Sequence, residues 1–154
     1  MEMKLGLITY GCGESFQRVL FEPIKNREWI KPHGGLWSSP IDSELGWADW
    51  CKSNDYGNLS QSFEFEFEGN VFVIDSYDDA LSAPILTCDV LDYKKHYIDF
   101  EKLIALGYDA VWLTECGEYE TRNFNRPLSL YGWDCESVLI MNPDCILESC
   151  EVSA

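Results

Sequence analysis

Two short stretches of the sequence combine residue types that can do chemistry on a flat, polar ligand. The first, from Lys31 to Pro40 (KPHGGLWSSP), carries two glycines, a tryptophan and two serines. Adjacent glycines let the backbone approach a ligand, the indole offers a flat face with one N–H donor, and the hydroxyls can donate or accept. In the second, from Trp133 to Pro143 (WDCESVLIMNP), Asp134 and Glu136 precede four apolar residues. A carboxylate at the head of a buried strand is well placed to face a cleft.

A purely structural interpretation of both stretches stays open from the residues alone. The two glycines suit a tight turn, and an aromatic residue such as Trp37 is more often part of a core than of a site. Glu136 can equally be a solvated strand end. His33 stands alone in a loop, so it is either a ligand contact or a bystander.

The order of the motifs resembles the NAD-dependent ADP-ribosyltransferase superfamily. That family has a glycine-led strand with an aromatic residue, then a short helix with further aromatic residues, and a late strand headed by glutamate. Here residues 35–39 (GLWSS) match the strand, residues 47–51 (WADWC) the helix and Glu136 the catalytic glutamate. Residues 106–111 (LGYDAV) add a fourth match in order. The three main patches are short.

The resemblance implies a chemical role for four residues. Glu136 would hydrogen-bond the ribose 2′-hydroxyl and stabilise the positive charge that develops as nicotinamide leaves. Trp37 would stack on the nicotinamide ring, and Ser38 stands where part of the family has a serine that steadies the glutamate. Asp134, two residues before Glu136 and expected on the same strand face, takes the place of a second acidic residue that selects arginine as acceptor.

The resemblance also implies a set of contacts to NAD, the expected co-substrate. At the end of the first strand the family usually has His or Arg before a glycine, but this chain has Tyr10 before Gly11. The hydroxyl of Tyr10 or Thr9 can act as donor there, or the position is an ordinary strand end. The positions assigned to NAD are Thr9, Tyr10, Gly11, Gly35, Leu36, Trp37 and Ser38.

Length and composition predict one folded domain over residues 1–154. The 46% hydrophobic content argues against disorder. No apolar run approaches the roughly 20 residues of a membrane helix, and the N-terminus lacks a signal-peptide pattern, so we expect a cytoplasmic protein without direct membrane contact. The seven cysteines form no Cys-x-x-Cys pair, so we expect neither a metal site nor a disulfide framework.

The net charge of −16, from 11 basic and 27 acidic residues, bears on the partners. Such a charge repels nucleic acid and membrane surfaces and favours a basic partner. The resemblance implies NAD and a macromolecular acceptor, and the charge makes a basic protein the best match, although solubility alone also explains such a charge. The alternative is a non-catalytic acidic binding or inhibitor protein on the same fold, which imitates nucleic acid. A third possibility is an interaction domain without an NAD site.

The elements that position these residues predict an α+β fold. We expect a single domain with split antiparallel sheets, arranged like a sandwich, and short flanking helices. The clearest local pattern is the alternation of Phe and Glu over residues 62–68, followed by Gly69-Asn70 and residues 71–75, which predicts a β-hairpin with its Phe side chains in the core. Further strands are expected at 3–10, 35–40, 108–113, 137–142 and 145–150. Helical segments are expected at 14–24, 47–51, 76–81 and 93–106, and an irregular acceptor loop at 114–130.

Overall fold

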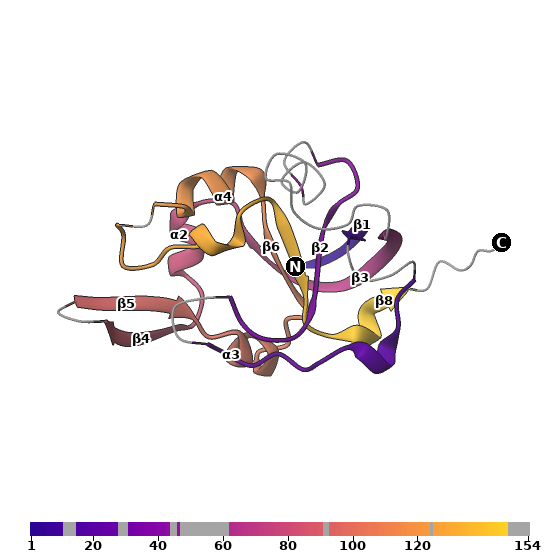
Figure 1. Cartoon of the computed structure of the whole chain (residues 1–154), viewed down its shortest axis with the longest axis horizontal. Coiled ribbons are helices and arrows are strands. Elements are labelled where there is room, and N and C mark those ends of the chain that lie inside the picture. Colours follow the sequence, from indigo (N-terminus) through magenta and orange to yellow (C-terminus); the bar gives the residue numbers. More distant parts are fainter. Residues whose placement is uncertain are drawn as a thin grey trace.

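The computed structural model describes residues 1–10, 15–27, 31–43, 46, 62–90, 93–123 and 125–147. Its strands are β1 (Glu2–Tyr10), β2 (Leu36–Pro40), β3 (Ser62–Ile74), β4 (Ile85–Val90), β5 (Tyr93–Ile98), β6 (Ala110–Leu113), β7 (Ser137–Ile140) and β8 (Ile146–Leu147). Its helices are α2 (Tyr77–Leu81), α3 (Phe100–Ala105) and α4 (Glu115–Thr121), with 3-10 turns η1 (Arg18–Leu20), η2 (Tyr131–Trp133) and η3 (Pro143–Cys145). The α+β prediction is confirmed: strands dominate and the helices are few and short (Figure 1).

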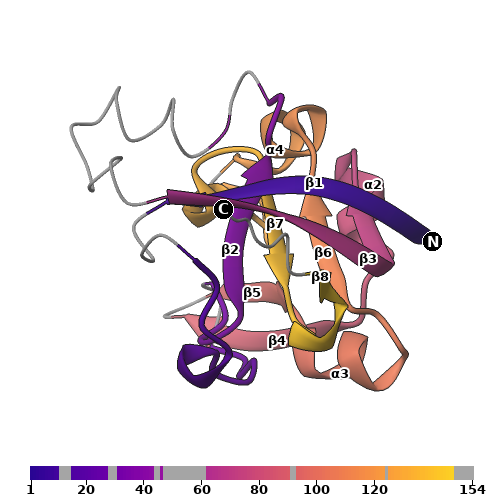
Figure 2. The same cartoon turned by 90° about the vertical axis from the view of Figure 1, so that its right-hand side faces the viewer.

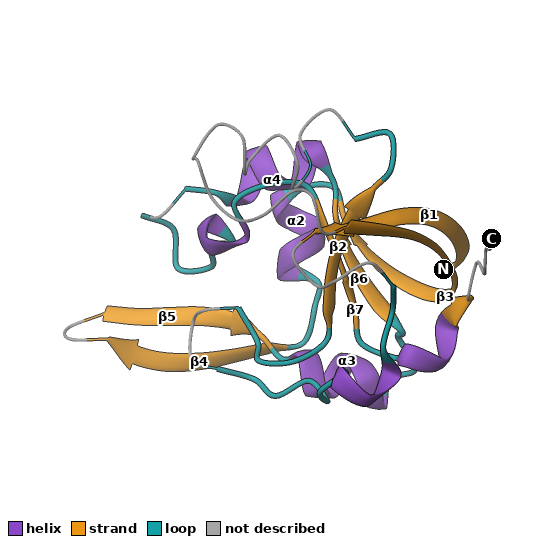
Figure 3. Ribbon diagram, turned by 45° about the vertical axis from the view of Figure 1, so that its right-hand side comes forward, coloured by secondary structure: helices purple, strands orange, loops and turns teal. Residues whose placement is uncertain are grey.

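The larger sheet closes on itself rather than stacking as a sandwich. Its strand order is β1-β2-β7-β6-β3-β8, and a further pairing of β1 with β3 completes a five-stranded barrel. All neighbouring pairs are antiparallel except β3 with β6. In Figure 2, β1 and the first part of β3 run side by side across β2, β7 and β6. The second sheet is the separate hairpin β4–β5, which projects from the barrel (Figure 3).

The predicted hairpin at Gly69-Asn70 is wrong, because β3 is one continuous strand. It pairs antiparallel with β1 up to Asn70 and parallel with β6 from Val71 onward, so the strand changes partner where the turn was expected. Gly69 serves close packing instead: a Cβ there would lie 2.8 Å from Asp109 Oδ2 and 2.9 Å from the ring of Phe67. The carboxylate of Asp109 also accepts a hydrogen bond from the backbone N–H of Asn70 at 2.8 Å.

The predicted alternation along β3 is confirmed. The three Phe side chains are buried and the three Glu side chains between them are exposed, as a strand with one face in a core requires. Every barrel strand contributes to the apolar cluster that these Phe residues join, so we call it the interior cluster. Its buried members are Leu7, Leu36, Phe63, Phe65, Phe67, Val71, Ala110, Val138, Ile140 and Ile146.

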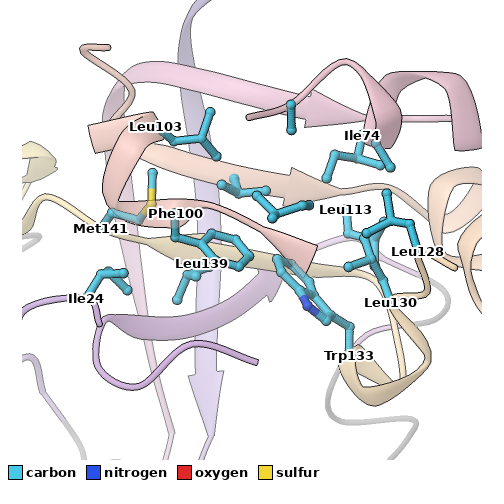
Figure 4. Packing of buried hydrophobic residues seen from close by; sticks show 14 residues of the cluster. Ile24, Ile74, Phe100, Leu103, Leu113, Leu128, Leu130, Trp133, Leu139 and Met141 are labelled. Atoms are coloured by element: carbon cyan, nitrogen blue, oxygen red, sulfur yellow. The ribbon is translucent and has the colours of Figure 1, made fainter. Parts of the chain in front are cut away.

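An outer cluster fills the space between the other face of the sheet and the helices and loops that cover it. Figure 4 shows Trp133 and Phe100 close together within it. Their ring centroids are 6.1 Å apart in a stacked arrangement, and Trp37 meets Trp133 edge-on at 4.8 Å. The buried members are Ile24, Ile74, Ala80, Ala83, Ile98, Phe100, Leu103, Val111, Leu113, Leu128, Leu130, Trp133, Leu139 and Met141.

Two predicted helices are wrong in part, because strand and loop replace most of them. The segment 93–106 is strand β5 followed by α3, which starts where the Asp99 side chain accepts a hydrogen bond from Lys102 N at 3.0 Å. Within 14–24, the described part has only the 3-10 turn η1. After α3, Gly107 has φ of 98°, a conformation that glycine commonly supplies at the end of a helix.

Other segments were predicted with mixed success. The helical turn after Asp75 is confirmed as α2, with the Ser76 side chain as its N-cap. The segment 114–130 is not wholly irregular, because Thr114 caps α4 by accepting from Gly117 N at 3.0 Å. The predicted helix at 47–51 lies outside the described residues. Among the helices of the described residues, none has both the length and the apolar character that crossing a membrane requires.

Candidate functional site

Glu136 lies immediately before β7 and is held in place by hydrogen bonds, although only 7% of the residue is exposed. Its carboxylate accepts a hydrogen bond from the indole Nε1–H of Trp112 at 3.0 Å and one from the Ser43 hydroxyl at 2.5 Å. Its backbone carbonyl accepts another from the Ser39 hydroxyl at 3.0 Å. A carboxylate fixed in this way is oriented before any ligand arrives.

A cavity of about 350 Å³ opens beside this carboxylate. Among the described residues, its lining includes the carboxylates of Asp42, Glu115 and Glu136, the ring of Trp112 and one cation. That cation, Lys4, is already paired with Glu66 at 3.4 Å. The cavity therefore combines a flat aromatic surface with an excess of negative charge, which suits a ligand that carries or develops positive charge.

Sequence reasoning missed both residues that hold the carboxylate, Ser43 and Trp112, as well as the other charged residues of the lining, Lys4, Asp42 and Glu115. The predicted contact between Ser38 and Glu136 is wrong: the Ser38 hydroxyl is fully buried and donates to the Val138 carbonyl at 2.8 Å, which joins β2 to β7. Ser43 contacts the carboxylate instead. Trp112 had a usable signal, because a tryptophan inside an apolar strand must find an acceptor for its N–H.

In the described part of the chain, Trp37 and the Glu136 carboxylate lie on opposite faces of the sheet. Trp37 lies directly opposite Leu139 in the pairing of β2 with β7, and residues paired in this way share a face of the sheet. Leu139 belongs to the outer cluster, and Trp37 packs against that cluster. Trp112, which donates to Glu136, packs against the interior cluster. The sheet thus separates the indole of Trp37 from the carboxylate, and Trp112 is the ring beside Glu136.

The glycine pair before β2 serves close packing against other segments. Gly35 has φ of 75°, and its N–H donates to the Glu22 carbonyl at 2.8 Å. A Cβ at Gly35 would lie 2.7 Å from Leu139 Cδ1. Leu36, the next residue, is buried in the interior cluster. These contacts explain the two glycines without a ligand.

Asp134 does not share a strand face with Glu136. It follows η2 in a left-handed conformation, with φ of 69°, before β7 begins. Its carboxylate pairs with the Lys31 ammonium at 3.7 Å, and that ammonium lies 5.0 Å from the centre of the Trp37 ring. Burial lowers the pKa of Lys31, and the carboxylate of Asp134 partly offsets this effect. Asp134 therefore belongs to the outer side of the sheet.

The positions assigned to NAD on the first strand are only partly described. The Thr9 side chain is 1% exposed, and its hydroxyl donates to the Trp37 carbonyl at 3.1 Å, so it links β1 to β2. Tyr10 ends β1 and is half-buried. Gly11 lies outside the described residues. Within the described part of the chain, no three His, Cys, Asp or Glu side chains gather as metal ligands.

The chain was also compared with known proteins. It matches no protein-family model, no curated protein and no solved structure. We therefore infer function from the site itself.

Proposed function

We propose that this chain transfers ADP-ribose from NAD to a protein or nucleic-acid acceptor and releases nicotinamide, with Glu136 as its catalytic carboxylate. The observation that carries the proposal is the Glu136 side chain, which two donors hold at the wall of the 350 Å³ cavity. Cleavage of the bond between nicotinamide and ribose develops positive charge on the sugar. A carboxylate that is already oriented stabilises this charge without reorganisation.

The composition of the cavity supports the same reaction. The nicotinamide end of NAD carries a positive charge, and the carboxylates of Asp42 and Glu115 add to the negative field of Glu136. Trp112 supplies the flat surface that the resemblance had assigned to Trp37. The net charge of −16 favours a basic protein as the acceptor. The alternative acceptor is a nucleic acid, which the same charge repels.

The proposal is tested by incubating the full chain with NAD labelled in its adenosine part, with and without cell lysate. Glu136→Gln should lower nicotinamide release and label transfer by about 10²- to 10³-fold, because it removes the charge that stabilises the transition state. Glu2→Gln is the matched control, since it removes a carboxylate from an exposed position on β1. Its rate should equal that of the parent, and both variants should keep the parent's circular dichroism spectrum.

Two results decide against this proposal. If Glu136→Gln releases nicotinamide as fast as the parent, Glu136 has no catalytic role. If the parent neither releases nicotinamide nor binds NAD in calorimetry, the transferase function itself is excluded.

A second candidate function is that of a non-catalytic acidic binding protein. The observation that favours it is the row of exposed glutamates Glu64, Glu66 and Glu68 on one face of β3, in a chain of net charge −16. Alternate residues of a strand point to the same side, so these carboxylates form a regular acidic row on one face of the strand, to which a basic partner can bind. Absence of NAD binding in the experiment above, with a complex that dissociates in high salt, would select this candidate.

A further inference from the structure

A cavity of about 420 Å³ lies on the outer side of the sheet, away from Glu136. One wall is β5 and another is the segment 127–133, which runs along that strand. The backbone N–H of His96 donates to the Pro127 carbonyl at 2.9 Å, and His96 forms a parallel bridge with Leu128. The cavity is therefore formed by segments that backbone hydrogen bonds fix to one another, and its volume falls within the range of small-molecule sites, about 300–1,000 Å³.

The floor of this cavity is apolar and aromatic. Trp133, Phe100 and Leu128 all line it, and each is at most 3% exposed. These residues belong to the outer cluster, in which the ring of Trp133 stacks on Phe100 (Figure 4). The same ring meets Trp37 edge-on. Tyr131, 60% exposed, adds a further ring to the lining. A flat, apolar group can pack on this floor.

The charges around the cavity are opposite to those of the chain as a whole. Of the chain's 11 basic residues, Arg27, Lys31 and Lys95 line it, and the described lining includes no Asp or Glu although the chain has 27. At physiological salt a charge acts over about 8 Å, so nearby groups outweigh the distant acidic surface. Among these nearby groups, the Asp134 carboxylate offsets the charge of Lys31, so Arg27 and Lys95 supply most of the uncompensated positive charge. The local field therefore attracts an anion.

The three cations are available in different degrees. Lys31 is paired with Asp134 at 3.7 Å, with 27% of its side chain exposed, and Lys95 Nζ donates to the Arg126 carbonyl at 3.4 Å. Arg27 has no ion pair within the part of the chain that the structure describes. Its planar guanidinium can hold a phosphate or carboxylate through two parallel hydrogen bonds.

A neighbouring cavity extends the same site. It has a volume of about 350 Å³ and shares Arg27 and Lys31 with the larger cavity. Its lining includes the ring of Trp37 and the backbone of Gly34 and Gly35. It also includes Glu22, whose carboxylate lies 3.2 Å from His33 Nε2. The two shared cations thus stand between an aromatic cavity on one side and a glycine-lined one on the other.

We propose that this site binds a planar organic anion. The aromatic ring of the ligand packs on the buried floor, and its phosphate or carboxylate group pairs with the three cations. The site is separate from the proposed transferase centre, because Trp133 and Glu136 lie on opposite sides of the sheet. It does not depend on the proposed function.

The test is calorimetry of the full chain with three probes that share one ring: phenyl phosphate, benzoate and uncharged phenol. At least one anionic probe should bind, at least about tenfold more tightly than phenol, because a charge-assisted hydrogen bond contributes about 1.5–3 kcal/mol and 1.4 kcal/mol is tenfold in affinity. The preferred probe shows whether the natural ligand carries phosphate or carboxylate.

Variants locate the binding. Lys95→Gln and Arg27→Gln should each lower the affinity for the anion at least about fivefold and leave the affinity for phenol unchanged. Lys94→Gln is the matched control, since Lys94 is the next residue on β5, is exposed and does not line the cavity. Glu136→Gln should also bind the anion like the parent.

Three results would overturn the proposal. The first is no binding of either anion at concentrations up to about 10 mM, which corresponds to less than about 3 kcal/mol. The second is equal affinity for phenol and the anions. The third is an equal loss of affinity in Lys94→Gln and Lys95→Gln, which would place the anion elsewhere on the surface.

Discussion

Replacing Trp112 with phenylalanine removes the indole N–H that reaches Glu136 and keeps an aromatic ring in its place. The hydrogen bond measures 3.0 Å and its acceptor carboxylate is nearly buried. A hydrogen bond to a charged group contributes about 1.5–3 kcal/mol, and one between neutral groups about 0.5–1.5 kcal/mol. Trp112→Phe should therefore lower the free energy of unfolding by about 1–1.5 kcal/mol more in the parent than in the Glu136→Gln background.

The double-mutant cycle isolates this difference. Phenylalanine is smaller than tryptophan, but the loss of packing is the same in both backgrounds and cancels from the coupling energy. The four proteins are compared by urea denaturation at pH 7, followed by circular dichroism. In thermal unfolding the same coupling corresponds to about 2–6 °C for a chain of this length.

Trp37→Phe is the control for this cycle. It makes the same chemical change on the opposite face of the sheet, so its coupling to Glu136→Gln should stay below about 0.5 kcal/mol. If Trp112→Phe also couples by less than that, or if the two tryptophans couple equally, the carboxylate is not held by Trp112. The account of a pre-oriented Glu136 would then fail.

Two further predictions concern stability, and both are measured by urea denaturation. Gly117→Ala should lower the free energy of unfolding by about 3 kcal/mol or more, because its Cβ would lie 1.9 Å from the Ile74 carbonyl oxygen. Gly132→Ala is the control: no atom lies within 4 Å of the new Cβ, so the free energy of unfolding should hardly change. Burial raises the pKa of Glu118 above its ordinary value of 4.5, and its Oε2 atom has no hydrogen-bond partner in the described structure. As pH rises above 4.5, the unfolded chain loses this proton before the folded one, so the parent loses stability. Glu118→Gln should accordingly be more stable than the parent at pH 7, with the gain vanishing well below pH 4.5; a gain that does not change with pH would contradict this cause.

The strand at residues 62–68 shows what a local sequence pattern can predict and what it cannot. Alternating Phe and Glu predict a strand and which side chains are buried, because successive side chains of a strand point to opposite faces. The same pattern does not say which strands become its neighbours. Gly69-Asn70 therefore indicated a turn, although the chain continues as a strand and its partner changes from β1 to β6.

The prediction of a helix over residues 93–106 fails for a related reason. Its apolar residues fit a helical spacing, but residues 93–98 form a strand because they pair with β4. Only the part after Asp99 is helical, where a capping side chain is available. Tertiary pairing here overrides the local periodicity.

For the site, the sequence by itself determined that a glutamate heads an apolar strand and that a glycine-led strand carries a tryptophan. The structure decided that Trp37 and Glu136 face opposite sides of one sheet, and that Ser43 and Trp112 hold the carboxylate. The side of the sheet that a side chain faces depends on the register of strand pairing, because a shift of one residue turns every side chain of a strand to the other face. Register between β2 and β7 is fixed by contacts across about 100 residues of chain, such as that of Ser38 with Val138, which local sequence does not encode.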